Sequence, residues 1–191
     1  MQDVRTNNFS ALLAQEAAIA PNARVFFQGA ARYGRLEMCQ WLHATYDLTS
    51  ADARADDNCA LRYAAEYGHL SVCRWLHATF HLTAADARTS DNYALRWAAA
   101  RGHLAVCQWL HTTYGLTSTD ARARNNDALC VAAGKGLVAP CQWLHATYGL
   151  TAADWDPHFC HASSAVAAWI RGLRTKARLR ELAAELTALA E

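Results

Sequence analysis

The chain has 191 residues, and its 18 basic and 17 acidic side chains give a net charge of +1 at pH 7. This balance, with a pI near 7.7, argues against a dedicated nucleic-acid-binding protein, because such proteins usually carry a strongly basic surface. A hydrophobic fraction of 53% excludes a wholly disordered chain, and the low counts of glycine (9) and proline (3) disfavour a turn-rich all-β fold.

The segment 1–22 precedes the regular part of the sequence. Gln15 and Glu16 interrupt its apolar residues, so we expect no secretory signal there. No stretch of the chain approaches the roughly 18 consecutive apolar residues that a membrane span needs. We therefore expect residues 1–22 to form an N-terminal helical cap of a protein without membrane contact.

From residue 23 the sequence repeats with a fixed period of 34 positions. The windows 57–90 and 91–124 are identical at 21 of 34 positions. A fixed period of this length is typical of a solenoid, in which each unit buries its apolar face against its neighbours. We divide the chain into repeats 23–56, 57–90, 91–124 and 125–158, followed by a diverged C-terminal capping repeat, 159–191.

Each window predicts a pair of helices. In the second window, Asp57 and Asn58 are candidate caps for a first helix over 59–67. Gly68 follows that helix, where a glycine ends helices by adopting a positive φ. A second helix is expected over 70–79, because its apolar residues fall at helical spacing.

A recurring Leu-Thr-x-x-Asp-Ala-Arg segment joins the helix pairs. Its threonine precedes its aspartate by three residues, as in an N-terminal capping box, so we expect a short helical turn. A β-hairpin is the alternative, which the helix preference of alanine and arginine disfavours. The threonine–aspartate pairs are Thr49–Asp52, Thr83–Asp86, Thr117–Asp120 and Thr151–Asp154.

The segment 60–73, Ala-Leu-Arg-Tyr-Ala-Ala-x-x-Gly-His-Leu-x-Val-Cys, resembles the ankyrin repeat, whose hallmark is Thr-Pro-Leu-His-x-Ala-Ala-x-x-Gly-His. The variant with Gln-Trp-Leu-His-Ala-Thr-Tyr-Gly-Leu-Thr is similar to ankyrin-repeat proteins encoded by giant DNA viruses of amoebae and by some protists. The resemblance implies an all-α, ankyrin-like solenoid of stacked helix-turn-helix repeats with helical caps. The chain departs from the family pattern in its 34-residue period, in lacking the Thr-Pro pair, and in carrying Arg62 or Arg96 where the family has histidine.

Cysteine and histidine recur four residues apart in each second helix. Both are zinc ligands, but a tetrahedral site needs four ligands within about 2.0–2.3 Å, whereas neighbouring helices lie about 8–10 Å apart. We therefore expect buried thiols beside hydrogen-bonded imidazoles, with no metal and no cofactor, and rank a metal-binding protein third among the functions. The pairs are Cys39–His43, Cys73–His77, Cys107–His111 and Cys141–His145.

The tryptophans of the second helices recur with the same period. A base-stacking platform would need exposed aromatic rings in a positively charged groove, and only one of the four tryptophans has an arginine beside it. We expect these side chains to pack between successive second helices, with an exposed contact stripe as the alternative. They are Trp41, Trp75, Trp109 and Trp143.

The C-terminal segment combines a basic run over 171–180 with a leucine stripe. We interpret it as a capping helix whose charged outer face keeps the end of the stack soluble, with nuclear localisation or binding to an anionic surface as the alternative. The leucines of the stripe are Leu179, Leu182, Leu186 and Leu189.

Enzyme motifs do not emerge from the sequence. Gly134-Lys135-Gly136 lacks the spacing of a phosphate-binding loop, and the aspartates that recur once per repeat fit helix caps better than an acid–base pair. The chain is therefore predicted not to be an enzyme. The resemblance implies instead a non-catalytic module that binds a partner protein through the concave face made by the first helices and their loops.

Residues that vary between repeats at family contact positions are the candidates for binding. They are Tyr33, Glu66, Tyr67, Tyr93, Arg101 and Lys135. We expect a monomer that binds an unknown protein, and neither nucleic acid nor membrane, in the cytoplasm (the host cytoplasm if the source is viral) with the nucleus as the alternative. A structural or self-assembling component of the virion type is the second hypothesis.

Overall fold

The computed structural model describes residues 20–150, 154 and 162–189, and every regular element within them is a helix. This confirms the predicted all-α fold. Most of the predicted N-terminal cap, residues 1–22, lies outside the described residues, which begin with a short 3-10 helix, η1 (Ala20–Asn22).

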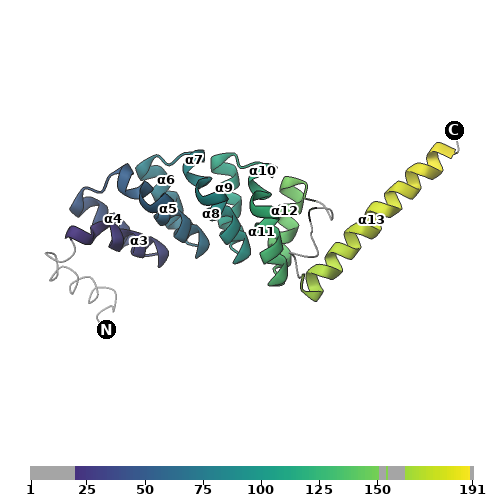
Figure 1. Cartoon of the computed structure of the whole chain (residues 1–191), viewed down its shortest axis with the longest axis horizontal. Helices are drawn as coiled ribbons and strands as arrows, with labels where there is room; N and C mark the ends of the chain where they lie inside the picture. The colour runs from purple at the N-terminus through teal and green to yellow at the C-terminus, as the bar shows by residue number, and fades with distance from the viewer. Residues whose placement is uncertain (1–19, 151–153, 155–161, 190–191) are drawn as a thin grey trace.

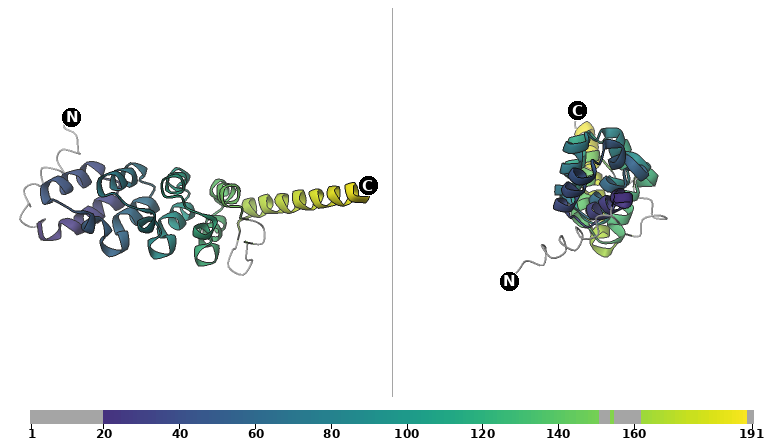
Figure 2. Two further views of the ribbon diagram at one scale, coloured as in Figure 1. Left: turned by 90° about the horizontal axis from the view of Figure 1, so that it is seen from above. Right: turned by 90° about the vertical axis from the view of Figure 1, so that its left-hand side faces the viewer.

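The helices form two layers that run along an elongated array (Figures 1 and 2). Each first helix packs against the first helix of the next repeat, and each second helix does the same in its own layer. The first helices are α3 (Ala23–Arg32), the second half of α5 (Ser50–Glu66), α8 (Thr89–Ala100) and α11 (Ala123–Gly134). The second helices are α4 (Leu36–Tyr46), α6 (Leu70–Phe80), α9 (Leu104–Tyr114) and α12 (Val138–Tyr148).

The core lies between these layers and is built from small residues facing larger ones. Ala64 and Ala65 are fully buried on the first helix of the second repeat, which lets neighbouring helices approach closely. Leu61 from the same helix and Cys73 and Leu76 from α6 fill the space between them. Because each repeat supplies one slice of this core, its burial depends on the repeats on both sides.

The predicted helix ends are confirmed to within one residue in the second repeat, where the first helix ends at Glu66 and α6 spans Leu70–Phe80. Gly68 between them has a φ of +80°, a conformation that L side chains rarely adopt. A Cβ placed there would lie 2.4 Å from Nδ1 of His103, which belongs to the next repeat. Glycine is therefore required at this turn by the backbone and by the packing of the next repeat.

Short helical turns join the helix pairs, as predicted. They are α7 (Ala84–Ala87), α10 (Ser118–Ala121) and the first turn of α5. Each begins with a complete capping box: in α7, Asp86 Oδ2 accepts hydrogen bonds from the backbone N–H of Thr83 at 2.7 Å and from its hydroxyl at 2.9 Å. Of the fourth predicted pair, Thr151 lies outside the described residues.

Three of the four aspartates, all except Asp52, also connect successive repeats, which sequence reasoning missed. Arg54 Nε and Nη2 donate to Oδ1 and Oδ2 of Asp86 at 2.9 and 3.2 Å, a bidentate pair across one repeat junction. Burial alone would raise the pKa of Asp86, but the hydrogen bonds from Arg54 and Thr83 outweigh it and lower that pKa. Equivalent pairs follow at the next two junctions. They are Arg88–Asp120 and Arg122–Asp154.

The predicted caps of the first helix are wrong in their geometry. Asp57 and Asn58 have φ values of +58° and +56°, whereas a capping residue is normally extended. Asn58 is buried, and its side-chain amide donates to the Thr89 hydroxyl of the next repeat at 2.9 Å. These residues therefore form a left-handed loop, a conformation that asparagine and aspartate tolerate better than most residues.

The last helix, α13 (Ser164–Leu189), packs on the array only through its first turns. Val166 and Ile170 are buried against the last repeat, whereas Leu179 is 60% exposed. Figure 1 shows the helix running away from the stack beyond this contact. The predicted capping contact is thus limited to the beginning of the helix.

Candidate functional site

Four of the six predicted contact residues occupy one repeat position. Tyr33, Tyr67, Arg101 and Lys135 each follow directly after the last residue of a first helix. Tyr33 is 68% exposed, Arg101 and Lys135 are also exposed, and Tyr67 is half-buried. We call this line of side chains, which follows one edge of the first-helix layer, the edge row.

Glu66 was predicted to contact a partner, but it is buried, with only 5% of its surface exposed. Its carboxylate is occupied within the chain: Arg101 Nη2 donates to Oε1 at 2.5 Å, and the Tyr93 hydroxyl donates to Oε2 at 2.6 Å. Burial, followed by the hydrogen bond to Glu66, raises the pKa of Tyr93. Glu66 therefore positions Arg101 and Tyr93 and is not available to a partner.

Tyr67 lies between two arginine side chains from neighbouring repeats. Arg32 Nη2 donates to the Tyr67 hydroxyl at 2.9 Å, and its guanidinium carbon lies 5.2 Å from the ring centroid. Arg101 lies over the same ring at 4.6 Å. Arginine over an aromatic ring contributes about 0.5–1 kcal/mol at exposed sites, so these contacts hold both guanidinium groups in place. Arg32 was not predicted, although it precedes Tyr33 as Glu66 precedes Tyr67.

A second arginine–tyrosine contact lies deeper on the same face. Arg62 lies 4.7 Å from the centroid of the Tyr93 ring, and it donates from Nε and Nη2 to the backbone carbonyls of Asp57 and Asp56. Arg62 therefore fastens its own left-handed loop while it contacts the next repeat. Sequence reasoning noted Arg62 only as a departure from the family pattern.

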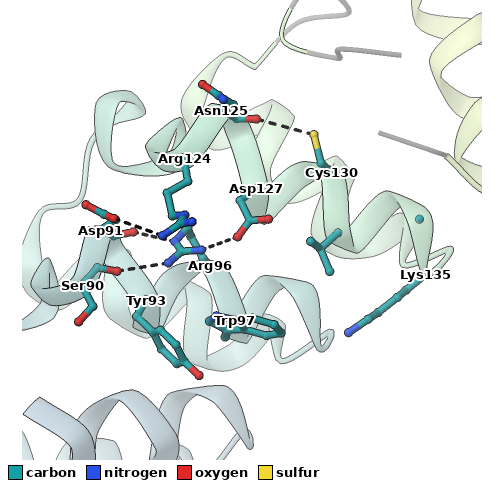
Figure 3. Close-up of a pocket in the computed structure, with 12 residues that line it drawn as sticks. Ser90, Asp91, Tyr93, Arg96, Trp97, Arg124, Asn125, Asp127, Cys130 and Lys135 are labelled. Carbon is teal, nitrogen blue, oxygen red and sulfur yellow. Dashed lines mark hydrogen bonds and ion pairs between the residues drawn. The ribbon is translucent and has the colours of Figure 1, made fainter. Parts of the chain in front are cut away.

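A groove of about 940 Å³ opens between α8 and α11 (Figure 3). On the α8 side it is lined by Tyr93 and Trp97, and on the α11 side by Val131 and Gly134. The position of Val131 is held by tyrosine and tryptophan in the two preceding repeats, so the fourth repeat leaves space that a large side chain fills elsewhere. The smaller side chain at this repeat position in the fourth repeat thus creates the groove.

Charged side chains at one end of the groove are paired with one another. Arg96 is buried; it forms an ion pair with Asp127 and donates to the backbone carbonyls of Asp91 and Ser90 at 2.7 and 3.2 Å. Arg124 lies 3.7 Å from the Asp91 carboxylate on the surface. Figure 3 shows these pairs beside the aromatic wall, with Lys135 extended at a distance from them.

The cysteine–histidine ladder has the predicted structural role. The Nδ1–H of His77 donates to the Leu82 carbonyl at 3.0 Å, and the corresponding bond recurs in the other repeats. The four thiols are fully buried, and burial raises the pKa of Cys39, Cys107 and Cys141 to about 12. Within the described residues, histidine, cysteine and acidic side chains nowhere gather in the threes that a metal ion needs.

The tryptophan column packs between second helices, as predicted. Trp109 contacts Tyr114 of its own helix edge-to-face, with ring centroids 5.5 Å apart, and His77 of the preceding repeat at 6.1 Å. All four tryptophans are partly buried against the core. These rings therefore stabilise the stack and are not arranged as an exposed platform.

Comparison with known proteins gives one match. Residues 27–120 match the family model of ankyrin repeats, in three copies. Searches of curated proteins and of solved structures found no match. Among the helices that the structure describes, none combines the length and the apolar character of a bilayer span.

Proposed function

Because the chain carries ankyrin repeats, whose general role is to mediate protein–protein interactions, we propose that it is a non-catalytic module that binds a partner protein on its first-helix layer. The contact surface consists of the edge row and the neighbouring arginines. This is the concave helix-1/loop face that the family resemblance implies. The repeat boundaries and the two capping segments defined from the sequence belong to the same proposal.

The observation that carries this proposal is the exposed arginine–tyrosine surface at the first two repeats. Tyrosine and arginine are enriched where proteins bind each other. Tyr33 is mostly exposed, and Arg32 beside it has no carboxylate partner among the described residues. An acidic group of a partner can therefore approach Arg32 without displacing an existing ion pair.

The surface is also fixed before binding. Glu66 holds Arg101, which lies over Tyr67, and Arg32 donates a hydrogen bond to the hydroxyl of this tyrosine. Side chains that are already ordered lose little conformational entropy when a partner binds. This supports recognition by a preformed face.

Self-assembly into a larger structure is the second candidate function. The observation that favours it is α13, whose second half extends beyond the stack with Leu179 exposed. The proposed location is the cytoplasm, with the nucleus as the alternative. An origin in a giant virus of amoebae stays a prediction that rests on the sequence resemblance.

The experiment compares two charge-reversed proteins of matched design. One carries Arg32→Glu with Tyr33→Ala on the first-helix layer, and the other carries Arg74→Glu with Gln40→Ala on the exposed side of the second helices. Each tagged protein is used to capture partners from an amoeba lysate, and captured proteins are identified by mass spectrometry. Circular dichroism and light scattering establish equal helicity and the oligomeric state.

We expect a defined partner that the wild type and the Arg74→Glu protein retain and the Arg32→Glu protein loses. Equal capture by all three proteins would contradict a binding site on the first-helix layer. Association of the wild type with itself at rising concentration, without any captured partner, would favour the self-assembling alternative.

A further inference from the structure

The contacts between first helices follow a fixed register. The last residue of one first helix meets the edge-row residue of the next repeat, 35 positions later. Arg32 contacts Tyr67 in this way, and Glu66 contacts Arg101. At the next junction the corresponding residues are Ala100 and Lys135, and the methyl group of alanine cannot bind a cation.

Within the part of the chain that the structure describes, Lys135 therefore has no counter-charge. No ion pair involves it among the residues that the structure describes, in contrast to Arg101, which pairs with Glu66 in the same register. Its exposed side chain lines the groove together with Trp97 and Val131. The groove thus combines an apolar centre with an unmatched positive charge.

The other charged side chains around the groove already form ion pairs within the chain. Arg96 is bound by Asp127 and two backbone carbonyls, and Arg124 lies beside Asp91. The two aspartates also disfavour a polyanion, because a row of phosphates entering the groove would meet their negative charges. A ligand with a single carboxylate suits this arrangement better than a nucleic acid.

We propose that the groove between α8 and α11 binds an acidic side chain of the partner protein together with a neighbouring apolar side chain. The partner's glutamate or aspartate occupies the place opposite Lys135 that Glu66 occupies opposite Arg101. The apolar side chain enters the space between Trp97 and Val131. This inference rests on the proposed function and names the chemistry that it recognises.

The probe is a peptide selected on the whole protein. A phage-displayed library of random peptides is panned on the immobilised wild type, and the best binder is synthesised with a fluorescent label. A second peptide replaces its acidic residue by the corresponding amide. We expect the selected sequence to contain glutamate or aspartate next to an apolar residue.

Two substitutions test the site from opposite directions. Lys135→Gln removes the cation from the surface, and Ala100→Glu supplies the missing carboxylate from within the chain, as Glu66 does one junction earlier. Loss of a charge-assisted hydrogen bond corresponds to roughly 10- to 100-fold in affinity, so we expect each variant, and the amide peptide on the wild type, to weaken binding by about that factor. Arg74→Gln, on the exposed side of the second helices and outside the groove, is the control and should stay within about twofold.

The location of binding is followed independently by NMR. The indole N–H signal of Trp97 should shift when the peptide is added to the wild type and stay in place with Lys135→Gln. Circular dichroism establishes that the variants are folded. Because Lys135 is exposed, its substitution tests the proposal even if the buried Ala100→Glu change prevents folding.

Unchanged affinity with Lys135→Gln, or a selected peptide without an acidic residue, overturns the proposal. If binding survives Lys135→Gln and Ala100→Glu but is lost with Arg32→Glu and Tyr33→Ala, only the groove is refuted and the proposed function stands. If one peptide binds all of these variants equally, the first-helix layer is not the binding face and both proposals fail.

Discussion

Replacing Asp86 by alanine tests how much the arginine–aspartate pairs stabilise the stack. Asp86 caps α7, and loss of a capping side chain costs about 1 kcal/mol. It also forms an ion pair with Arg54. The Asp86 side chain is 9% exposed and that of Arg54 is 36% exposed, so this pair lies between the exposed and the buried extremes and we assign it about 1–2 kcal/mol. Asp86→Ala should therefore lower the free energy of unfolding by about 2–3 kcal/mol.

Asp52 provides the matched control. It caps its own turn through the backbone N–H and hydroxyl of Thr49, at 2.8 and 2.7 Å. Position 20, where the arginine of a preceding repeat would stand, is alanine, so Asp52 lacks the pair. Asp52→Ala should cost only about 1 kcal/mol, and the difference between the two variants measures the contact between repeats.

The assay is equilibrium unfolding in urea, followed by far-ultraviolet circular dichroism. A double-mutant cycle of Asp86→Ala with Arg54→Ala should give a coupling of about 1–2 kcal/mol that decreases when NaCl is raised from about 50 mM to about 1 M. Equal losses for Asp86→Ala and Asp52→Ala, or a coupling near zero, would refute the view that these pairs stabilise the junctions.

Three further predictions concern the core, the turns and the pH dependence. The Tyr114 hydroxyl is buried and has no hydrogen-bond partner among the described residues, and Phe80 holds the same place one repeat earlier. Tyr114→Phe should therefore leave the free energy of unfolding unchanged or raise it by about 1 kcal/mol in thermal unfolding, and a loss above about 1 kcal/mol would contradict this. Gly68→Ala should lower the free energy of unfolding more than Gly115→Ala, because both glycines have a positive φ but only a Cβ at position 68 would clash with His103. Equal losses of stability for the two variants would contradict that contact. Burial, with nearby positive charge, lowers the pKa of His103, and hydrogen bonds lower the pKa of the capping aspartates. Because these groups bind protons more readily in the unfolded chain, the free energy of unfolding should fall as the pH drops below about 6.5 and again below about 4. Urea titrations that show no change in this free energy between about pH 7.5 and about pH 3 would contradict the prediction.

The repeat itself was predictable because period and capping are local properties of the sequence. The 34-residue spacing fixed the helix pairs, and the three-residue spacing of Thr83 and Asp86 was sufficient to predict a capped turn. The left-handed loop at Asp57 and Asn58 was misread as a cap, since the same residue types favour both conformations.

Contacts between repeats were not predictable in the same way. The period shows that Arg54 and Asp86 each recur, but it does not show which position of one repeat faces which position of the next. The burial of Glu66 depends on this register, because Tyr93 and Arg101 come from the following repeat. The groove depends in addition on the small residues opposite Trp97, whose effect appears only when neighbouring helices are placed side by side.

The direction of the arginine–aspartate pairs has a consequence for how such a chain can change in length. The second and third repeats each offer an arginine to the following repeat and an aspartate to the preceding one, as Arg88 and Asp86 of the second repeat illustrate. A unit gained by in-frame duplication, or lost by deletion, would leave matching groups on both sides of the new joint. Array length can therefore vary during evolution without redesign of each joint, while the edge row of every added unit remains free to acquire a new side chain.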